Sequence, residues 1–351
     1  MKKVLVVATS RKTRGGITSV IKAHETGEQW KKFHCRWIET HRDGNAVRKI
    51  CYFITALMEY ILLLPFYDIV HIHVASYPSL RRKRYFLLLA KLWHKKTIAH
   101  FHPHKPEVIF DKRHQNDYIY FFKSVDKIVV LSPQWQRWLK EALNITDDVQ
   151  VIFNPCPIVS CEKADHSKKY ILFAGTLYKR KGFDTLLKAF AKIAPRHKDW
   201  SIILAGNAKT EEDRLLINTL PKQLNIENQV EFPGWITGRR KDQIFRNSSI
   251  FCLASSGEGF PMAVLDAWAY GVPVVCTPVG GLPDIVEDGV NALLFNYGDD
   301  QTLAIQLEKL ITDENLRTSI AKESLKLANT IFNVNNINKQ IGEIYLSLSN
   351  E

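Results

Sequence analysis

Short runs of apolar and β-branched residues alternate with longer segments of helical periodicity along almost the entire chain. Strands that are regularly separated by helices are typical of βαβ units, in which a parallel sheet is covered by helices. In such α/β folds the ligand site lies at the carboxyl ends of the strands. The segments predicted as strands are Val4–Ala8, Asp68–Val74, Lys96–His102, Lys127–Leu131, Val149–Phe153, Tyr170–Ala174, Ser201–Ala205, Gln229–Phe232, Ser249–Leu253 and Val272–Cys276.

The chain has 351 residues, which is enough for two domains that each bury a sizeable core. A Pro-containing and then polar segment, from Asn154 to Lys169, interrupts the alternation and predicts the domain boundary. The predicted parts are an N-terminal domain of residues 1–160, a C-terminal domain of residues 161–334, and a final helix in residues 335–351. We expect both domains to be Rossmann-like and to face a central cleft.

The cysteines and the apolar stretches indicate the compartment. The six cysteines contain no Cys-x-x-Cys pair, which favours reduced thiols of a cytosolic protein over a disulfide framework or a zinc site. The first eight residues predict a strand rather than a signal peptide. No apolar stretch is expected to reach the roughly 18 to 20 residues that a membrane-spanning helix needs.

The net charge of +12 lies entirely in the first half of the chain. Residues 1–160 hold 26 Lys and Arg against 13 Asp and Glu, whereas residues 161–351 hold 22 against 23. This asymmetry predicts an anionic partner for the first half alone. Nucleic acid, an anionic membrane surface and a diphosphate-linked lipid all have the required charge.

An acidic residue, Glu258, lies in a glycine-flanked loop, and a second acidic residue, Asp266, follows eight positions later. The apolar segment around Asp266 predicts a buried helix that ends at Gly271. Eight residues are close to two helical turns, so the spacing predicts both carboxylates on nearly one face. Backbone N–H groups at a helix N-terminus favour phosphate. Together these features predict a nucleotide-sugar site.

This segment resembles the donor-site signature of the retaining family 4 glycosyltransferases, which have the GT-B architecture. That signature is Glu, seven residues, Glu, then Gly-x-Pro-Val and a Gly-Gly pair. Here it reads Glu258, Asp266, Gly271-Val272-Pro273-Val274 and Gly280-Gly281, with Asp266 in the place of the second Glu. The resemblance implies that Glu258 holds the donor sugar, that Asp266 holds ribose hydroxyls, and that the intervening loop residues Gly259, Phe260, Pro261 and Met262 contact the donor.

A second motif, Gly175-Thr176 to Lys181-Gly182, follows a predicted strand and precedes a predicted helix, Phe183–Ile193. Two cations at such a turn, Arg180 and Lys181, can neutralise a diphosphate leaving group. The alternative is a solvated run of charges in a loop. The resemblance favours the donor site, although Thr176 stands where many members have Arg. It also implies donor contacts from the Gly15-Gly16 loop, which is expected near the donor diphosphate, and from Trp235 beside the nucleotide base.

Histidines with period-two spacing, His71-x-His73 and His100-x-His102-Pro103-His104, suggest a metal cluster because alternate residues share one face of a strand. No Cys or carboxylate cluster completes the set, and the resemblance implies an enzyme that works without a bound metal or other cofactor. It places His102 near the reacting sugar as a catalytic residue, with His100 and His104 on the acceptor side.

Residues 81–96 form a predicted helix with basic ends and aromatic residues near both of them. Lys, Arg, Trp and Tyr suit the headgroup zone of a bilayer, so this segment is a candidate for contact with an anionic membrane surface. A buried crossover helix with solvated ends would have the same composition. With the charge asymmetry, the first interpretation predicts a cytoplasmic protein that is peripheral on the inner face of the membrane.

The resulting hypothesis is a retaining glycosyltransferase that moves a sugar from a nucleoside-diphosphate sugar to a hydroxyl of a glycan or lipid-linked oligosaccharide, in cell-surface polysaccharide biosynthesis. The resemblance assigns acceptor binding to residues 1–160 and donor binding to residues 161–334. Catalysis is assigned to Glu258, His102, Arg180 and Lys181. One alternative is a non-catalytic nucleotide-sugar-binding partner of a glycosyltransferase complex. A nucleic-acid-binding protein is suggested only by the pI of about 9.3, and the motifs that such proteins use are missing.

Overall fold

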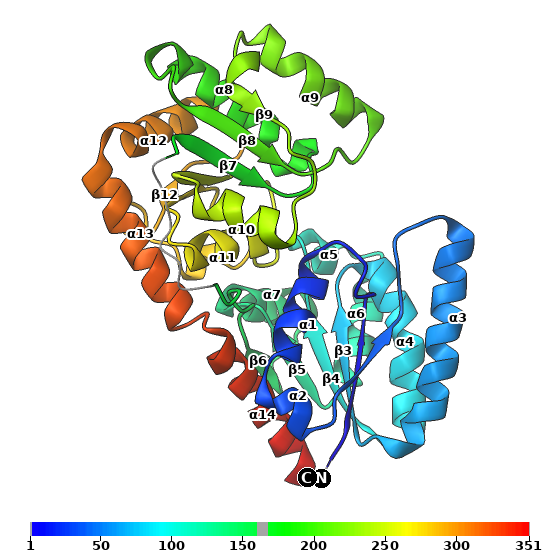
Figure 1. Cartoon of the computed structure of the whole chain (residues 1–351). Helices are drawn as coiled ribbons and strands as arrows, with labels where there is room; N and C mark the ends of the chain where they lie inside the picture. The colour runs from blue at the N-terminus through cyan, green and yellow to red at the C-terminus, as the bar shows by residue number, and fades with distance from the viewer. Residues whose placement is uncertain (1, 160–167, 351) are drawn as a thin grey trace. The chain divides into compact units, whose positions relative to one another are not determined.

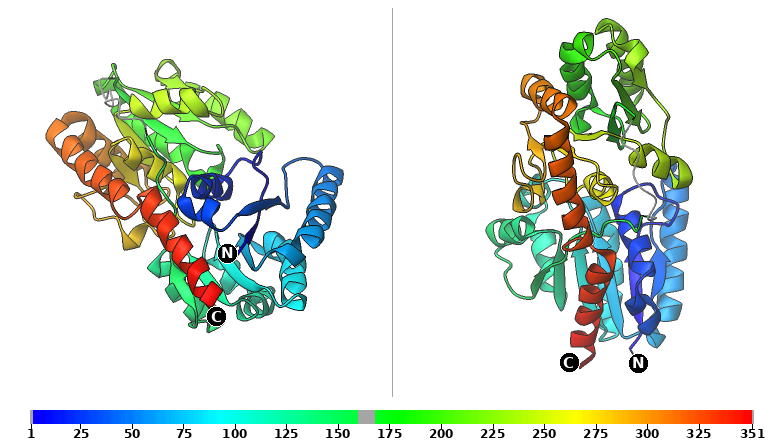
Figure 2. Two further views of the ribbon diagram at one scale, coloured as in Figure 1. Left: turned by 60° about the horizontal axis from the view of Figure 1, so that its bottom comes forward. Right: turned by 60° about the vertical axis from the view of Figure 1, so that its left-hand side comes forward.

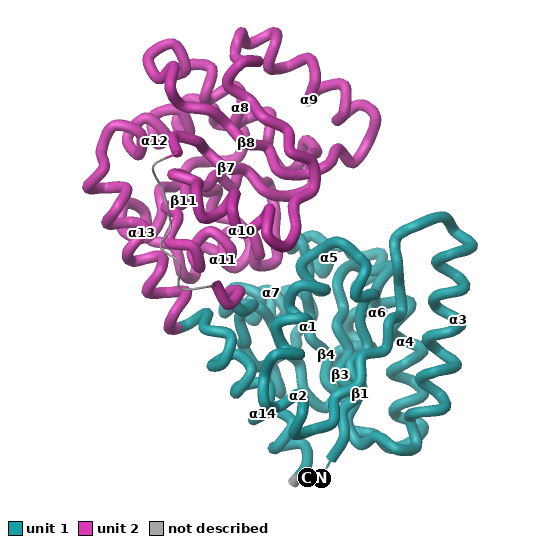
Figure 3. The backbone as a smooth tube through the Cα atoms, viewed as in Figure 1, with its two compact units in different colours: residues 1–155, 331–351 teal, residues 156–330 magenta. Residues whose placement is uncertain are grey.

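The computed structural model describes residues 2–159 and 168–350, which divide into two compact units (Figure 3). Unit 1 contains residues 1–155 and 331–351, and unit 2 contains residues 156–330. These borders lie a few residues before the predicted ones, and the final helix belongs to unit 1. The predicted border between residues 160 and 161, and with it Cys161, lies outside the described residues.

Unit 1 is built on a parallel six-stranded sheet with the order β2-β1-β3-β4-β5-β6 (Figure 1). The strands are β1 (Val4–Ala8), β2 (Arg36–Glu39), β3 (Ile69–Val74), β4 (Lys96–Phe101), β5 (Lys127–Val130) and β6 (Val149–Val151). β3 and β4 are the longest, and each is buried over nearly its whole length. Strands buried on both faces need apolar residues at consecutive positions, which is the pattern in this half of the sequence.

Helices cover both faces of this sheet (Figure 1). They are α1 (Gly16–Glu25), α2 (Glu28–Lys32), α3 (Ala46–Leu63), α4 (Tyr77–Leu92), α5 (Glu107–Phe110), α6 (Gln115–Lys123), α7 (Pro133–Leu143) and α14 (Val334–Asn350). The C-terminal α14 packs against α1 and α2, and its residues Ile337, Ile341 and Tyr345 join the core formed with β1. The described chain therefore begins and ends at the same end of unit 1 (Figure 2).

Unit 2 has a second parallel six-stranded sheet, with the order β12-β11-β10-β7-β8-β9. The strands are β7 (Tyr170–Ala174), β8 (Ser201–Ala205), β9 (Val230–Glu231), β10 (Ile250–Leu253), β11 (Val274–Cys276) and β12 (Leu293–Leu294). The helices are α8 (Phe183–Ile193), α9 (Glu211–Gln223), α10 (Gly238–Arg246), α11 (Met262–Ala269), α12 (Asp300–Thr312) and α13 (Glu314–Asn329). The apolar sides of α8 and α12 form the main core of this unit with β7 and β8.

The predicted α/β class of two Rossmann-like domains is confirmed, and every predicted strand is present within three residues of its predicted ends. Two strands were not predicted, β2 and β12, and both lie at sheet edges. An edge strand buries fewer apolar side chains, so its sequence pattern is weak.

Two predictions for the first half of the chain differ from the structure. The helix predicted for residues 81–96 spans Tyr77–Leu92, and Lys96 already begins β4. By length and composition alone, residues 46–66 form a helix apolar enough to cross a membrane, so the expectation that no stretch reaches this length was wrong. Only 17% of its most apolar window is buried within the protein.

Candidate active site

The loop that follows β10 places Glu258 among polar groups in unit 2. The Glu258 carboxylate forms an ion pair with Lys181, and its Oε1 accepts a hydrogen bond of 2.7 Å from Ser255 Oγ. Ser255 is fully buried and the Glu258 side chain is 10% exposed, so the charge is largely withdrawn from water. A buried carboxylate is stable only when it is paired and hydrogen-bonded, and here both conditions hold.

Arg180 lies beside this pair, in the short turn Lys179–Lys181 that follows β7. Its guanidinium donates hydrogen bonds to Tyr178 Oη, at 2.9 Å from Nε, and to the carbonyl oxygen of Gly257. The backbone carbonyl of Arg180 accepts from Ser256 N–H at 2.9 Å. The loops after β7 and β10 are therefore joined through Arg180, which places two cations next to Glu258.

Gly280 allows a third loop, after β11, to approach the same place. Its φ of +63° lies in the left-handed region, and a Cβ at this position would overlap the carbonyl oxygens of Glu258 and Gly259. Gly281 N–H donates to the Gly259 carbonyl at 2.9 Å, and Thr277 Oγ1 donates to the Ser255 carbonyl at 2.6 Å. Gly280 of the motif is thus needed for close backbone packing around Glu258, whereas Gly281 has an ordinary φ of −87° and contributes its backbone N–H.

Asp266 occupies a separate position on α11. This helix begins at Met262, so Glu258 precedes it, and the two carboxylates do not share a helix face as their spacing had predicted. The Asp266 carboxylate pairs with Lys241 Nζ at 2.7 Å. Burial raises the pKa of Asp266 above its ordinary value, and the nearby Lys241 opposes this shift. A carboxylate that is retained at a buried position, although burial disfavours its charged form, is a candidate for a ligand contact.

The remaining predicted donor residues lie in loops of both units. Gly175 follows β7 directly and has a φ of +154°, and the next residue, Thr176, is half-buried. Trp235 is half-buried, and its backbone N–H donates to Asn207 Oδ1 at 3.1 Å. In unit 1, Gly15 is the N-cap of α1 and Gly16 its first residue, at the end of the loop that follows β1. Phe260 and Pro261 are buried between Glu258 and α11.

Unit 1 holds a cluster of buried histidines. His71 and His73 lie on β3, His100 lies opposite His73 on β4, and His102 follows β4 directly. His102 Nε2 is hydrogen-bonded to His73 Nδ1 at 2.9 Å, and burial lowers the pKa of His102 to about 3. The imidazole of His102 is therefore neutral at physiological pH. His104 lies outside this stack, in a half-buried turn.

Several residues of these sites were not predicted from the sequence. Ser255 and Tyr178 both contact predicted site residues, and Lys241 pairs with Asp266. Ser255 and Tyr178 stand three and two positions before their partners in the sequence, which is a signal that could have been used. The ring centroid of His24 is 6.3 Å from that of His100. Both His24 and Lys241, which lies on α10, are far in the sequence from the residues that they contact, so only the fold brings them to the histidine cluster and to Asp266.

Comparisons with known proteins show which family and which fold this chain resembles. Residues 161–327 match the family described as glycosyl transferases group 1. An uncharacterized glycosyltransferase of Haemophilus influenzae is 33% identical over 209 residues, which cover 57% of this chain and 55% of that protein. The lipopolysaccharide core biosynthesis glycosyltransferase LpsE of Rhizobium meliloti is 29% identical over 213 residues, 58% of each protein. The chain spans about half the length of the curated relatives it matches.

The similarity to solved structures extends over the whole chain. Anabaena HepE, solved in complex with UDP and glucose, matches with a TM-score of 0.79 and 19% identity, covering 99% of this chain and 100% of that one. Two Rossmann-like units, each on a parallel six-stranded sheet, place the protein in the GT-B class of folds. The family match over residues 161–327 and the similarity to these relatives agree with the family 4 resemblance.

Proposed function

We propose that this protein is a retaining glycosyltransferase that transfers a sugar from a nucleoside-diphosphate sugar to a hydroxyl group. One observation carries the proposal. The Lys181–Glu258 ion pair lies beside Arg180 where the loops after β7 and β10 meet, so two cations and a carboxylate share one end of a Rossmann-like sheet. Ligands of such sheets bind at this end of the strands.

The chemistry follows from these groups. Arg180 and Lys181 neutralise the charge that develops on the departing diphosphate, and Glu258 accepts hydrogen bonds from sugar hydroxyls. Asp266 takes the ribose hydroxyls. His102 is assigned to the sugar because of its place directly after a central strand, and since its Nε2 is bonded to His73, its Nδ1 is the nitrogen assigned to the sugar contact. The acceptor hydroxyl attacks from the face that the diphosphate leaves.

Uridine is the nucleoside that we assign to the donor. Support comes from HepE, whose structures contain UDP, UDP with glucose, and UDP-glucose. The acceptor is proposed to be a glycan or lipid-linked oligosaccharide of the cell surface, with residues 1–160 as its binding domain. The similarity to LpsE, named for lipopolysaccharide core biosynthesis, supports a surface-polysaccharide role.

Peripheral attachment to the inner face of the cytoplasmic membrane is the second part of the proposal. The helices α3 and α4 pack through Tyr60, which donates a hydrogen bond of 2.9 Å to the Phe86 carbonyl, and both expose large apolar side chains. On α3 and the turn after it, Leu62 and Phe66 are 71% and 70% exposed. The exposed Arg81 and Lys91 of α4 add attraction to anionic lipid, whereas Lys83 is buried and donates to the Val7 carbonyl. The exposed apolar residues of this surface are Val47, Ile50, Ile54, Met58, Leu62, Phe66, Tyr85, Leu88, Leu92 and Trp93.

Sedimentation with phosphatidylglycerol vesicles tests the membrane surface. The Met58→Glu/Leu62→Glu variant should lose binding at 0.1 M salt, whereas Leu215→Glu, an exposed apolar residue of unit 2, should not. Equal binding by both variants would contradict the assignment to α3 and α4.

Calorimetric titration with UDP, GDP, dTDP and ADP tests the donor site, followed by transfer from UDP-glucose to a lipid-linked acceptor fraction. We expect binding of UDP and measurable transfer. Binding without transfer would favour the second candidate, a non-catalytic nucleotide-sugar-binding partner of a glycosyltransferase complex. The Lys181–Glu258 pair argues for an enzyme, because a mere binding partner has no need of a carboxylate at the sugar. Absence of binding by all four nucleotides would overturn the proposed function.

A further inference from the structure

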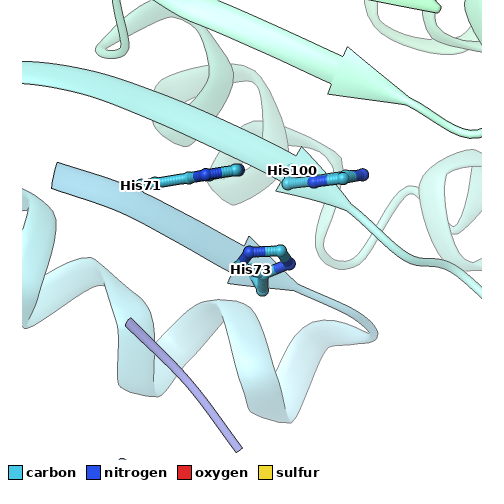
Figure 4. A group of neighbouring side chains, drawn as sticks. All are labelled: His71, His73 and His100. Carbon is cyan, nitrogen blue, oxygen red and sulfur yellow. The ribbon is translucent and has the colours of Figure 1, made fainter. Parts of the chain in front are cut away.

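Three histidines of the buried cluster bring ring nitrogens together at one point of unit 1. His71 and His73 project from β3 and His100 projects from β4, and one nitrogen of each lies within 4.8 Å of the other two (Figure 4). The rings of His71 and His100 are nearly parallel, with an interplanar angle of 3°. Each of the three side chains is 1% exposed.

The hydrogen bonds of two of these rings leave one nitrogen of each without a partner. His71 Nδ1 is bonded to Tyr345 Oη at 2.7 Å, and His73 Nδ1 is bonded to His102 Nε2 at 2.9 Å. Among the described residues, the Nε2 atoms of His71 and His73 and both ring nitrogens of His100 have no hydrogen-bond partner. Buried polar atoms are normally satisfied, so a group of them at one place needs an explanation.

His71 and His73 show the pattern that metal-ligating histidines have. A ligating imidazole binds the metal through one nitrogen and donates its other N–H to an oxygen or another acceptor, which fixes the tautomer and the ring. Tyr345 Oη and His102 Nε2 can accept these hydrogen bonds from His71 and His73. A neutral imidazole carries one N–H, so its other ring nitrogen has a lone pair that can bind a metal ion.

We propose that His71, His73 and His100 bind one divalent transition metal ion, with zinc as the best match to three imidazoles. Zinc–nitrogen bonds of about 2.0–2.1 Å place tetrahedral ligand nitrogens about 3.4 Å apart, so each ring needs to move inward by less than about 1 Å. Imidazole ligands also suit copper, nickel and cobalt. An ion at this point cross-links β3 to β4 and, through His73, sets the tautomer of His102.

The alternative is an apolar stack of neutral imidazoles that packs like any aromatic core. Such a stack explains the ring separations of 4.5 Å between His71 and His73 and 4.8 Å between His73 and His100. It leaves the four nitrogens unsatisfied at the centre of the unit, however, while the outer nitrogens of His71 and His73 are well paired. A metal ion binds three of these four nitrogens, one from each ring, and keeps the outer pairs of His71 and His73, while the second ring nitrogen of His100 has no partner among the described residues.

Metal binding by the full chain tests the proposal, and it is measured independently of sugar transfer. The protein is stripped with a chelator and titrated with Co²⁺, whose visible absorption reports tetrahedral nitrogen coordination, and with Zn²⁺ in competition. We expect one equivalent of either ion and a rise in the melting temperature. His71→Gln and His73→Gln should weaken the affinity at least about 100-fold by removing one ligand each.

Two further variants keep the test decisive. Tyr345→Phe retains all three ligands but removes the hydrogen bond to His71, and should weaken the affinity about 10-fold to 100-fold. His197→Gln removes a histidine of unit 2 that contacts Glu308, and should bind as the unchanged protein does. Absence of stoichiometric binding, or equal affinity in His71→Gln and His197→Gln, would overturn the proposal. If His71→Gln does not fold, unchanged affinity in Tyr345→Phe overturns it.

Discussion

Lys181 Nζ and the Glu258 carboxylate are bound to each other, so the two residues assigned to opposite ends of the donor's reacting bond neutralise one another. Ser255 holds the same carboxylate oxygen at 2.7 Å and keeps it in place if Lys181 turns away. A diphosphate that binds here competes with Glu258 for Lys181. Donor binding is therefore expected to release Glu258 for the sugar hydroxyls.

Removal of the Glu258 charge should separate nucleotide binding from transfer. Glu258→Gln leaves Lys181 without its counter-ion, so we expect UDP to bind as tightly as before or more tightly. Transfer should fall about 100-fold or more, because the strong acceptor for the sugar hydroxyls is lost. Calorimetry and a transfer assay on the same preparation measure both quantities. The surface variant Glu308→Gln is the control, and near-normal turnover by Glu258→Gln would contradict the role of this carboxylate.

Arg180 should determine nucleotide affinity. Its guanidinium joins the loops after β7 and β10 and can turn to a diphosphate. Loss of a charged hydrogen-bond donor costs about 1.5–3 kcal/mol, so Arg180→Ala should weaken UDP binding about 10-fold to 100-fold. Arg196→Ala, which removes an arginine paired with Glu308 at the surface, should leave UDP binding unchanged. Equal affinities in the two variants would place the diphosphate elsewhere.

The sequence was sufficient to predict the class of fold and all the strands except the edge strands β2 and β12. Runs such as Tyr170–Ala174 are buried on both faces, and their apolar pattern is unambiguous. The relation between Glu258 and Asp266 was not predictable, because an eight-residue spacing has this meaning only inside a continuous helix, and α11 begins four residues after Glu258. The Asp266–Lys241 pair depends on the packing of α10 beside α11, which no local pattern encodes.

Gly280 provides a test of the backbone packing around Glu258. An alanine at position 280 would have to adopt the left-handed φ of +63°, and its Cβ would overlap the carbonyl oxygens of Glu258 and Gly259. Gly298 has a similar φ of +81°, but a Cβ at that position meets no atom within 4 Å. Gly298→Ala should therefore lose only about 1–2 kcal/mol of unfolding free energy. Gly280→Ala should lose clearly more in urea denaturation and should also weaken UDP binding. Equal losses of unfolding free energy in the two variants would show that the loop shifts to make room for the added methyl group.

Asp266 should reduce the stability of the protein at neutral pH. Burial raises the pKa of Asp266 in the native state above the ordinary value of 3.8. At pH values between 3.8 and this native pKa, the native state therefore binds more protons than the unfolded state. Stability therefore falls as the pH rises through the native pKa. Asp266→Asn should raise the unfolding free energy at pH 7, and the gain should vanish below about pH 3.8, where both forms are neutral.

Asp242 is the matched control, because hydrogen bonds from Arg246 and Tyr270 lower its pKa. The contribution of Asp242 to stability has the opposite sign. Its carboxylate stabilises the protein at pH values above its pKa in the unfolded state, and this stabilisation is lost as the pH falls through its pKa in the native state. Asp242→Asn should therefore reduce stability at pH 7, where Asp266→Asn increases it. Denaturation of both variants at pH 7 and near pH 3.5 measures the contrast.

UDP binding by Asp266→Asn tests the ribose assignment. If this variant also weakens UDP binding, the protein keeps a destabilising carboxylate for its ligand; if UDP binding is unchanged, the ribose assignment is wrong.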